Sequence, residues 1–213
     1  MKKLILFACG VACAGSVLAQ GTIVFNNRVV GSVVAPIYNV DPANPTMQTT
    51  GNTATGFPAG TTTYGGPLLS GSGFTVQLWC APGANQAETS LVPALGYSES
   101  TFRTGAAAGL WTTSVNPAII PNAAEATVAT LELRVWDNLG GTVTDWASAV
   151  AGNGARGASP LFNSQPLGGV SPPPNLVGLV SFDLTGPGVV PEPSTFALAG
   201  LGAVALLIFR RRK

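Results

Sequence analysis

The chain has 213 residues, of which 9% are charged, and it contains 27 glycines and 17 prolines but no histidine. This composition favours a single globular body of short strands joined by turns. The lack of imidazole excludes hydrolysis by the common Ser-His-Asp and Cys-His arrangements and metal sites rich in histidine. Between residues 20 and 188, eight carboxylates outnumber four arginines. Because phosphate binding needs clustered cations, we expect no nucleic-acid partner.

Residues 1–19 have the three parts of a secretory signal peptide. Lys2 and Lys3 precede an apolar run over 4–14, and the small residue Ala19 precedes Gln20. This order predicts a helix that the Sec translocon accepts and that signal peptidase removes between Ala19 and Gln20. A lipoprotein signal at Cys13 is the alternative. It is disfavoured because Gly10 occupies the position where a lipobox has an apolar residue.

Alternating apolar residues predict the strands of the body in chain order. The first strand is expected over 22–26, the second over 74–80, the third over 127–136 and a late core strand over 177–184. In the third, Leu131, Leu133 and Val135 are expected to be buried, and the alternating residues, including Glu132 and Trp136, to be wet. Residues 39–66 and 151–174 are predicted to be solvated loops. We therefore predict an all-β fold, an antiparallel β-sandwich or jelly roll, over 20–188.

Cys80 is the one cysteine of the chain beyond the leader, where Cys9 and Cys13 lie. A lone thiol cannot close a disulfide within the body, although it can pair between chains. Cys80 shares the apolar side of its strand with Val76 and Leu78. We predict that it is buried and inert.

The end of the chain carries a second tripartite pattern over 189–213. Pro191, Glu192 and Pro193 are followed by an uncharged segment that starts at Thr195 and ends at Phe209, and then by Arg210, Arg211, Arg212 and Lys213. This pattern resembles the PEP-CTERM sorting signal. As a helix, the apolar segment is about 22 Å long at about 1.5 Å per residue, a marginal transmembrane span. The basic end is expected to stay on the cytoplasmic side.

The resemblance implies a route to the cell surface. In PEP-CTERM proteins the tail is a substrate of exosortase, which recognises the Pro-Glu-Pro motif, here Pro191, Glu192 and Pro193, and removes the anchor. The protein is thus expected to be held briefly in the inner membrane and then displayed at the surface or in the extracellular matrix. Phrases such as that at 134–137 resemble PEP-CTERM-bearing proteins of verrucomicrobial and planctomycete-type bacteria. A plain tail anchor is the alternative.

The sequence assigns no definite chemistry to the body, and we expect neither catalysis nor a cofactor. A structural role is the favoured interpretation. The alternative is carbohydrate binding, possible through exposed aromatic rings at Trp79 and Trp136, because such rings stack on sugars. A glycosidase pair, which would need two carboxylates across a cleft, and a calcium site are disfavoured. The glycosidase candidates are Glu99, Glu132, Asp137 and Asp145; the calcium candidates are Asp137, Asn138 and Asp145.

Overall fold

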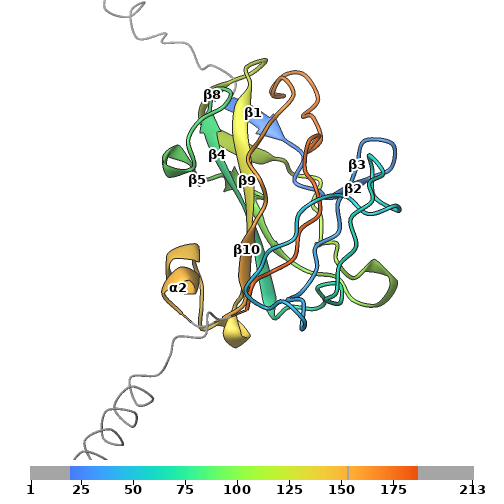
Figure 1. Ribbon diagram of the computed structural model, residues 1–213. Helices are drawn as coiled ribbons and strands as arrows, with labels where there is room; N and C mark the ends of the chain where they lie inside the picture. Colours follow the sequence, from blue (N-terminus) through green and yellow to red (C-terminus); the bar gives the residue numbers. More distant parts are fainter. Residues whose placement is uncertain (1–19, 153, 187–213) are drawn as a thin grey trace, which may run out of the picture.

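The computed structural model describes residues 20–152 and 154–186 (Figure 1). Its larger sheet has the strand order β10-β9-β4-β5, with β7 also paired to β4 and β11 to β9. The smaller sheet has the order β1-β8-β6, and β2 and β3 form a hairpin. The strands of the larger sheet are β4 (Phe74–Pro82), β5 (Val92–Pro93), β7 (Glu99–Thr101), β9 (Ala129–Asp137), β10 (Arg156–Ala158) and β11 (Phe162–Asn163). The remaining strands are β1 (Gln20–Ile23), β2 (Arg28–Val29), β3 (Val33–Val34), β6 (Leu95–Gly96) and β8 (Ala118–Ala124).

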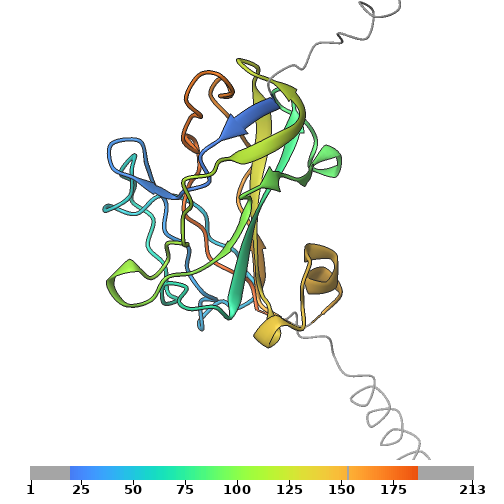
Figure 2. The same ribbon diagram turned by 180° about the vertical axis from the view of Figure 1, so that it is seen from behind.

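Helical structure is confined to short segments in the described residues. The α-helix α2 (Trp146–Ala151) lies on the opposite side of the larger sheet from the β2-β3 hairpin, as the two views show (Figures 1 and 2). The 3₁₀ turns are η1 (Glu88–Ser90), η2 (Gly105–Ala107) and η3 (Leu139–Gly141). The predicted all-β class is therefore confirmed, while the sandwich or jelly-roll arrangement stays a prediction.

The central pair of the larger sheet is β4 against β9, antiparallel and in register along both strands. Val76 pairs with Val135, Leu78 with Leu133 and Cys80 with Leu131. Because side chains alternate across a strand, all six point to the same face. There they join one core with residues from β1 and β8. The burial predicted for Cys80 is confirmed.

The outer face of β9 differs from the prediction. Glu132 is 3%, Arg134 6% and Trp136 0% exposed, so the wet face expected for this strand is wrong. The physical reason is α2, which packs over β9. The Trp146 ring meets the Trp136 ring edge-on at 6.2 Å, and the indole nitrogen of Trp136 donates to the carbonyl of Val143 at 3.2 Å.

The segments between the strands also correct the prediction in part. Residues 151–174, expected to be a loop, contain β10 and β11, which pair with β9. The strand expected over 177–184 is absent from the described structure as a continuous strand. Isolated bridges join Phe182 to Thr50 and Asp183 to Tyr38 instead, and Leu179, Phe182 and Leu184 are still buried.

Residues 39–66 contain no named strand, as predicted, and most of them are exposed or half-buried, but the two ends of the segment lie in close contact. Gly66 shows how close this contact is, because a Cβ atom there would lie 2.1 Å from the carbonyl oxygen of Asn39. Tyr38, Asn39 and Leu69 exchange backbone hydrogen bonds with neighbouring segments, which ties both ends of the loop to the body. The loop is therefore anchored to the body at both of its ends.

The predicted signal peptide and the predicted C-terminal helix lie outside the described residues. Across 20–152 and 154–186, no helix has the length and apolar character needed to cross a membrane.

Candidate functional site

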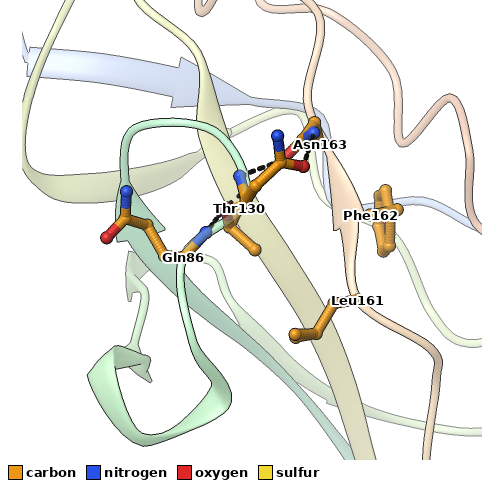
Figure 3. A pocket seen from close by; sticks show the side chains of 6 residues that line it. Gln86, Thr130, Leu161, Phe162 and Asn163 are labelled. Atoms are coloured by element: carbon orange, nitrogen blue, oxygen red, sulfur yellow. Dashed lines mark hydrogen bonds between the residues drawn. The ribbon is translucent and has the colours of Figure 1, made fainter.

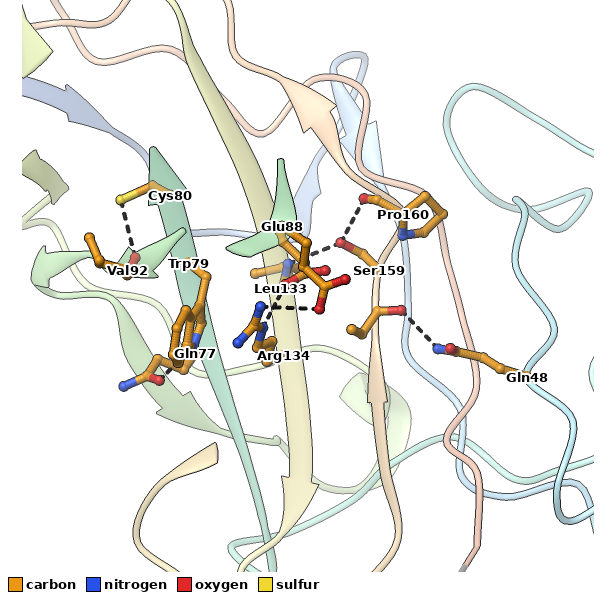
Figure 4. A network of polar contacts seen from close by, with 12 residues as sticks. Gln48, Gln77, Trp79, Cys80, Glu88, Val92, Leu133, Arg134, Ser159 and Pro160 are labelled. Atoms are coloured by element: carbon orange, nitrogen blue, oxygen red, sulfur yellow. Dashed lines mark hydrogen bonds and ion pairs between the residues drawn. The ribbon is translucent and has the colours of Figure 1, made fainter. Parts of the chain in front are cut away.

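Polar and aromatic side chains gather on the outer face of the larger sheet, where Figure 4 shows Gln77, Trp79, Glu88 and Arg134. We call this group the outer-face cluster. Its members are Gln77 and Trp79 from β4, Glu99 from β7, Glu132 and Arg134 from β9, and Glu88 from η1.

Strand register places these residues side by side. Trp79 pairs with Glu132, and Gln77 pairs with Arg134 on one side and with Glu99 on the other. Residues directly opposite each other in an antiparallel pair have their Cβ atoms about 5 Å apart. Glu99 and Arg134 are far apart in the sequence, and both lie beside Gln77 only because of the strand order. The sequence alone therefore does not reveal that these residues form one cluster.

Arg134 is the centre of the cluster. Its Nε donates to Glu132, and one terminal nitrogen lies 3.4 Å from an oxygen of Glu88, which is 63% exposed. Its guanidinium carbon lies 3.8 Å from the centre of the Trp79 ring and 5.3 Å from that of Trp146. Guanidinium groups favour this combination of a carboxylate partner and aromatic faces. The charge of Arg134 is therefore satisfied within the protein.

Two carboxylates of the cluster respond mainly to their burial. Burial raises the pKa of Glu132 above its ordinary value, while the hydrogen bond and charge of Arg134 oppose this. Burial likewise raises the pKa of Glu99, opposed by the hydrogen bond from Gln77. The side-chain nitrogen of Gln77 donates to Glu99 at 2.8 Å, and its oxygen accepts from the Trp79 indole nitrogen at 2.8 Å.

The cluster leaves limited surface for a ligand. Trp79 is half-buried, its indole N–H is engaged, and the Arg134 guanidinium lies over its ring. Trp136 exposes none of its surface. A ring stacks on a sugar only where its face is accessible, so the burial of Trp136 does not favour the carbohydrate contact predicted there.

The remaining candidate residues take structural roles in the turn after β9. Asp137 accepts from the backbone N–H of Leu139 at 2.9 Å, and Asn138 donates to the carbonyl of Ser72 at 2.7 Å. Asp145 accepts from the backbone N–H of Ser148 at 2.8 Å and so caps α2. Within the described ranges, no three acidic, cysteine or histidine side chains come together as a metal site.

A small hollow of about 250 Å³ lies beside β11, lined by Thr130, Phe162 and Asn163, among others (Figure 3). Its polar groups bond to one another. Asn163 and Asn85 exchange hydrogen bonds at 2.8 and 2.9 Å, and the Thr130 hydroxyl accepts from the backbone of Gln86 at 2.9 Å. This arrangement fastens the segment after β4 to β11.

A larger groove, of about 350 Å³, lies over residues 53–64 and is lined by Tyr38 and Tyr64 with several threonines. The sequence predicts a solvated loop over this stretch and does not predict the groove. The run of Thr61, Thr62, Thr63 and Tyr64 was the available signal, but the stacking of Tyr64 on Tyr38 depends on the fold.

The C-terminal segment is matched by a protein-family model. The model is that of the PEP-CTERM protein-sorting motif, and it matches residues 189–213. These residues are a PEP-CTERM protein-sorting motif. The match includes Pro191, Glu192 and Pro193 and extends to the basic end, so the resemblance read from the tail is confirmed at the level of the motif. It supports an exported protein that an exosortase sorts.

The other two comparisons found no match. No curated protein and no solved structure matches the chain. The PEP-CTERM motif covers the tail alone, so it assigns no activity to residues 20–188.

Proposed function

We propose that this protein is a non-enzymatic structural protein of the cell surface or extracellular matrix, sorted there by an exosortase. The observation that carries the proposal is the match of residues 189–213 to the PEP-CTERM motif. In this proposal the leader ending at Ala19 directs the chain through the Sec translocon, and signal peptidase cuts before Gln20. The tail then holds the chain in the inner membrane until Pro191, Glu192 and Pro193 are recognised.

Several charged groups of the body are engaged internally, which suits display. Glu132 and Arg134, 3% and 6% exposed, pair with each other on the outer face. The carboxylates of Asp145 and Glu125 accept hydrogen bonds from the backbone N–H groups of Ser148 and Ser171, respectively. In this proposal the two sheets form a sandwich whose task is to fold stably outside the cell.

A carbohydrate-binding module on the surface is the second candidate. The partial exposure of Trp79 beside Gln77 and Glu99 favours it, because aromatic rings flanked by polar groups are typical of sugar sites. Retention of the protein on extracellular polysaccharide, lost in Trp79→Ala, is the expected result for this candidate. Unchanged retention in Trp79→Ala would remove the outer-face cluster from consideration.

The sorting proposal is tested by locating the protein and sequencing both of its ends. Cells with and without the exosortase are fractionated, and the protein is recovered from the inner membrane, the cell surface and the medium. We expect surface protein that starts at Gln20 and lacks Arg210–Lys213 when the exosortase is present, and full retention in the inner membrane when it is absent. Surface protein with an intact basic end would favour a plain anchor.

A further inference from the structure

The groove over residues 53–64 has the features of a ligand site that the outer-face cluster lacks. Its lining residues are Tyr38, Thr53, Ala54, Thr55, Thr61, Thr62, Thr63 and Tyr64. A volume of about 350 Å³ is within the range of about 300–1,000 Å³ usual for small-ligand sites. The wall combines two aromatic rings with several hydroxyl groups, and every lining residue is uncharged.

The aromatic wall is held in one position. The rings of Tyr38 and Tyr64 stack with centroids 4.0 Å apart and planes 7° apart. The Tyr64 hydroxyl lies 2.6 and 2.7 Å from the carbonyl oxygens of Gly51 and Ser181, and it can donate its one proton to either. Burial raises the pKa of Tyr64, so this hydroxyl stays a neutral donor. Because the pair is fixed before any ligand arrives, binding would lose little rotamer entropy.

The threonine wall is held equally firmly by Asn52. Its side-chain nitrogen donates to the carbonyl of Pro58 at 2.9 Å, and its side-chain oxygen accepts from the backbone of Ser181 at 3.1 Å. The carbonyl of Asn52 also accepts from the backbone of Thr62 at 3.0 Å. The exposed residues Thr55, Thr61 and Thr63 therefore present their hydroxyls from a fixed backbone.

The chemistry of this wall selects the class of ligand. Hydroxyl groups both donate and accept hydrogen bonds, as sugar hydroxyls do, and a tyrosine face packs against the C–H groups of a sugar ring. An acidic glycan would meet no cation among the lining residues, and the excess of carboxylates in the body would repel it.

We propose that the groove formed by Tyr38, Tyr64 and the threonines of residues 53–63 binds a neutral sugar unit of a polysaccharide. This site goes beyond the proposed structural role, because display and sorting require no ligand. It also differs from the carbohydrate-binding candidate at Trp79, because neither Trp79 nor Trp136 lines the groove.

The test uses the full-length chain in mild detergent, titrated by calorimetry. The probes are cellohexaose, xylohexaose, mannohexaose and isomaltohexaose, with hexagalacturonate as the acidic comparison. We expect binding of at least one neutral hexasaccharide and weaker or absent binding of hexagalacturonate. Tyr38→Ala is expected to weaken binding about tenfold through the lost ring contact. Thr61→Val with Thr63→Val is expected to weaken it about fivefold through lost hydrogen bonds.

The control is Thr113→Val, an exposed threonine outside the groove, which is expected to bind like the parent protein. If Tyr38→Ala does not fold, the threonine pair decides, because valine keeps the shape of threonine. No binding of any neutral probe, equal binding of the acidic probe, or full binding by the threonine variant would overturn the proposal. Weakening by Trp79→Ala with no effect of the groove variants would overturn it too. None of these outcomes bears on sorting, which the localisation experiment tests separately.

Discussion

The guanidinium carbon of Arg134 lies 3.8 Å from the centre of the Trp79 ring, although the two residues are 55 positions apart in the sequence. They come from neighbouring strands, and Trp79 is directly paired with Glu132, the carboxylate to which Arg134 donates. A cation, its counter-ion and an aromatic face thus meet in one buried place. Burying an ion pair costs solvation free energy, and removing one partner leaves the other charge buried without compensation.

Removing Arg134 alone is therefore expected to destabilise the body strongly. Arg134→Leu leaves the Glu132 carboxylate buried without its cation and should lower the free energy of unfolding by about 3–5 kcal/mol. The measurement is urea unfolding of the exported protein, followed by tryptophan fluorescence. The double variant Glu132→Leu, Arg134→Leu removes both charges and is expected to be more stable than the single variant.

The matched control for this prediction is Arg103→Leu. Arg103 is exposed, so its loss should change the free energy of unfolding by less than about 0.5 kcal/mol. Equal effects of Arg103→Leu and Arg134→Leu would show that the outer-face cluster contributes nothing particular to stability.

The sequence predicted the central strands because their periodicity is local information. Alternation of large apolar residues over 74–80 and 131–135 requires only that one face be covered, and the core confirms it. The same alternation suggested that Trp136 is wet. That inference was wrong because the burial of the second face depends on α2. The six residues of α2 are too few to show a helical periodicity from which its packing against β9 could be predicted.

The candidate sites also differ in whether local sequence is enough to predict them. The sorting motif is continuous in the chain, so its order of proline, glutamate, apolar run and basic end could be read directly, and the family match confirms it. The Tyr38-Tyr64 pair joins two residues on either side of a long irregular segment. No periodic pattern links them, and only the folded loop brings their rings together.

Cys80 is expected to be unreactive in the folded protein. Burial raises the pKa of its thiol to about 12, and the thiolate is the reactive form. Alkylation with iodoacetamide at pH 8, followed by mass spectrometry of the peptide that contains Cys80, should find it unmodified in the native protein and modified in urea. Native alkylation at the rate of a small-molecule thiol would contradict the burial of this strand.

Asp183 is expected to make the body less stable as the pH rises. Burial raises the pKa of this carboxyl, so above its ordinary value of 3.8 the folded state binds more protons than the unfolded state. Stability is then highest below that pH and declines as the pH passes through the raised pKa. Asp183→Asn keeps an acceptor for the backbone N–H of Thr49 and should stabilise the protein at pH 7 by about 1 kcal/mol.

The gain from Asp183→Asn should shrink as the pH is lowered towards 3.5, which thermal unfolding at a series of pH values measures. Glu125→Gln is expected to show the opposite dependence of stability on pH. A backbone hydrogen bond from Ser171 lowers the pKa of Glu125, so its stabilisation exists at neutral pH and is lost on acidification. A pH-independent gain from Asp183→Asn would show that its carboxyl is not perturbed.

The sorting tail makes the most direct prediction, because its parts can be changed separately. Glu192→Gln removes the charge between Pro191 and Pro193 but leaves the apolar segment and the basic end intact. If the exosortase recognises this motif, Glu192→Gln should still be exported and anchored, yet accumulate in the inner membrane with the tail attached. Replacing Arg210, Arg211, Arg212 and Lys213 by serine should instead weaken the retention of that end on the cytoplasmic side, because Lys and Arg set the orientation of a span. Cell fractionation with sequencing of the C-terminus distinguishes the two defects. Normal surface delivery of both variants would mean that the tail is not what directs this protein.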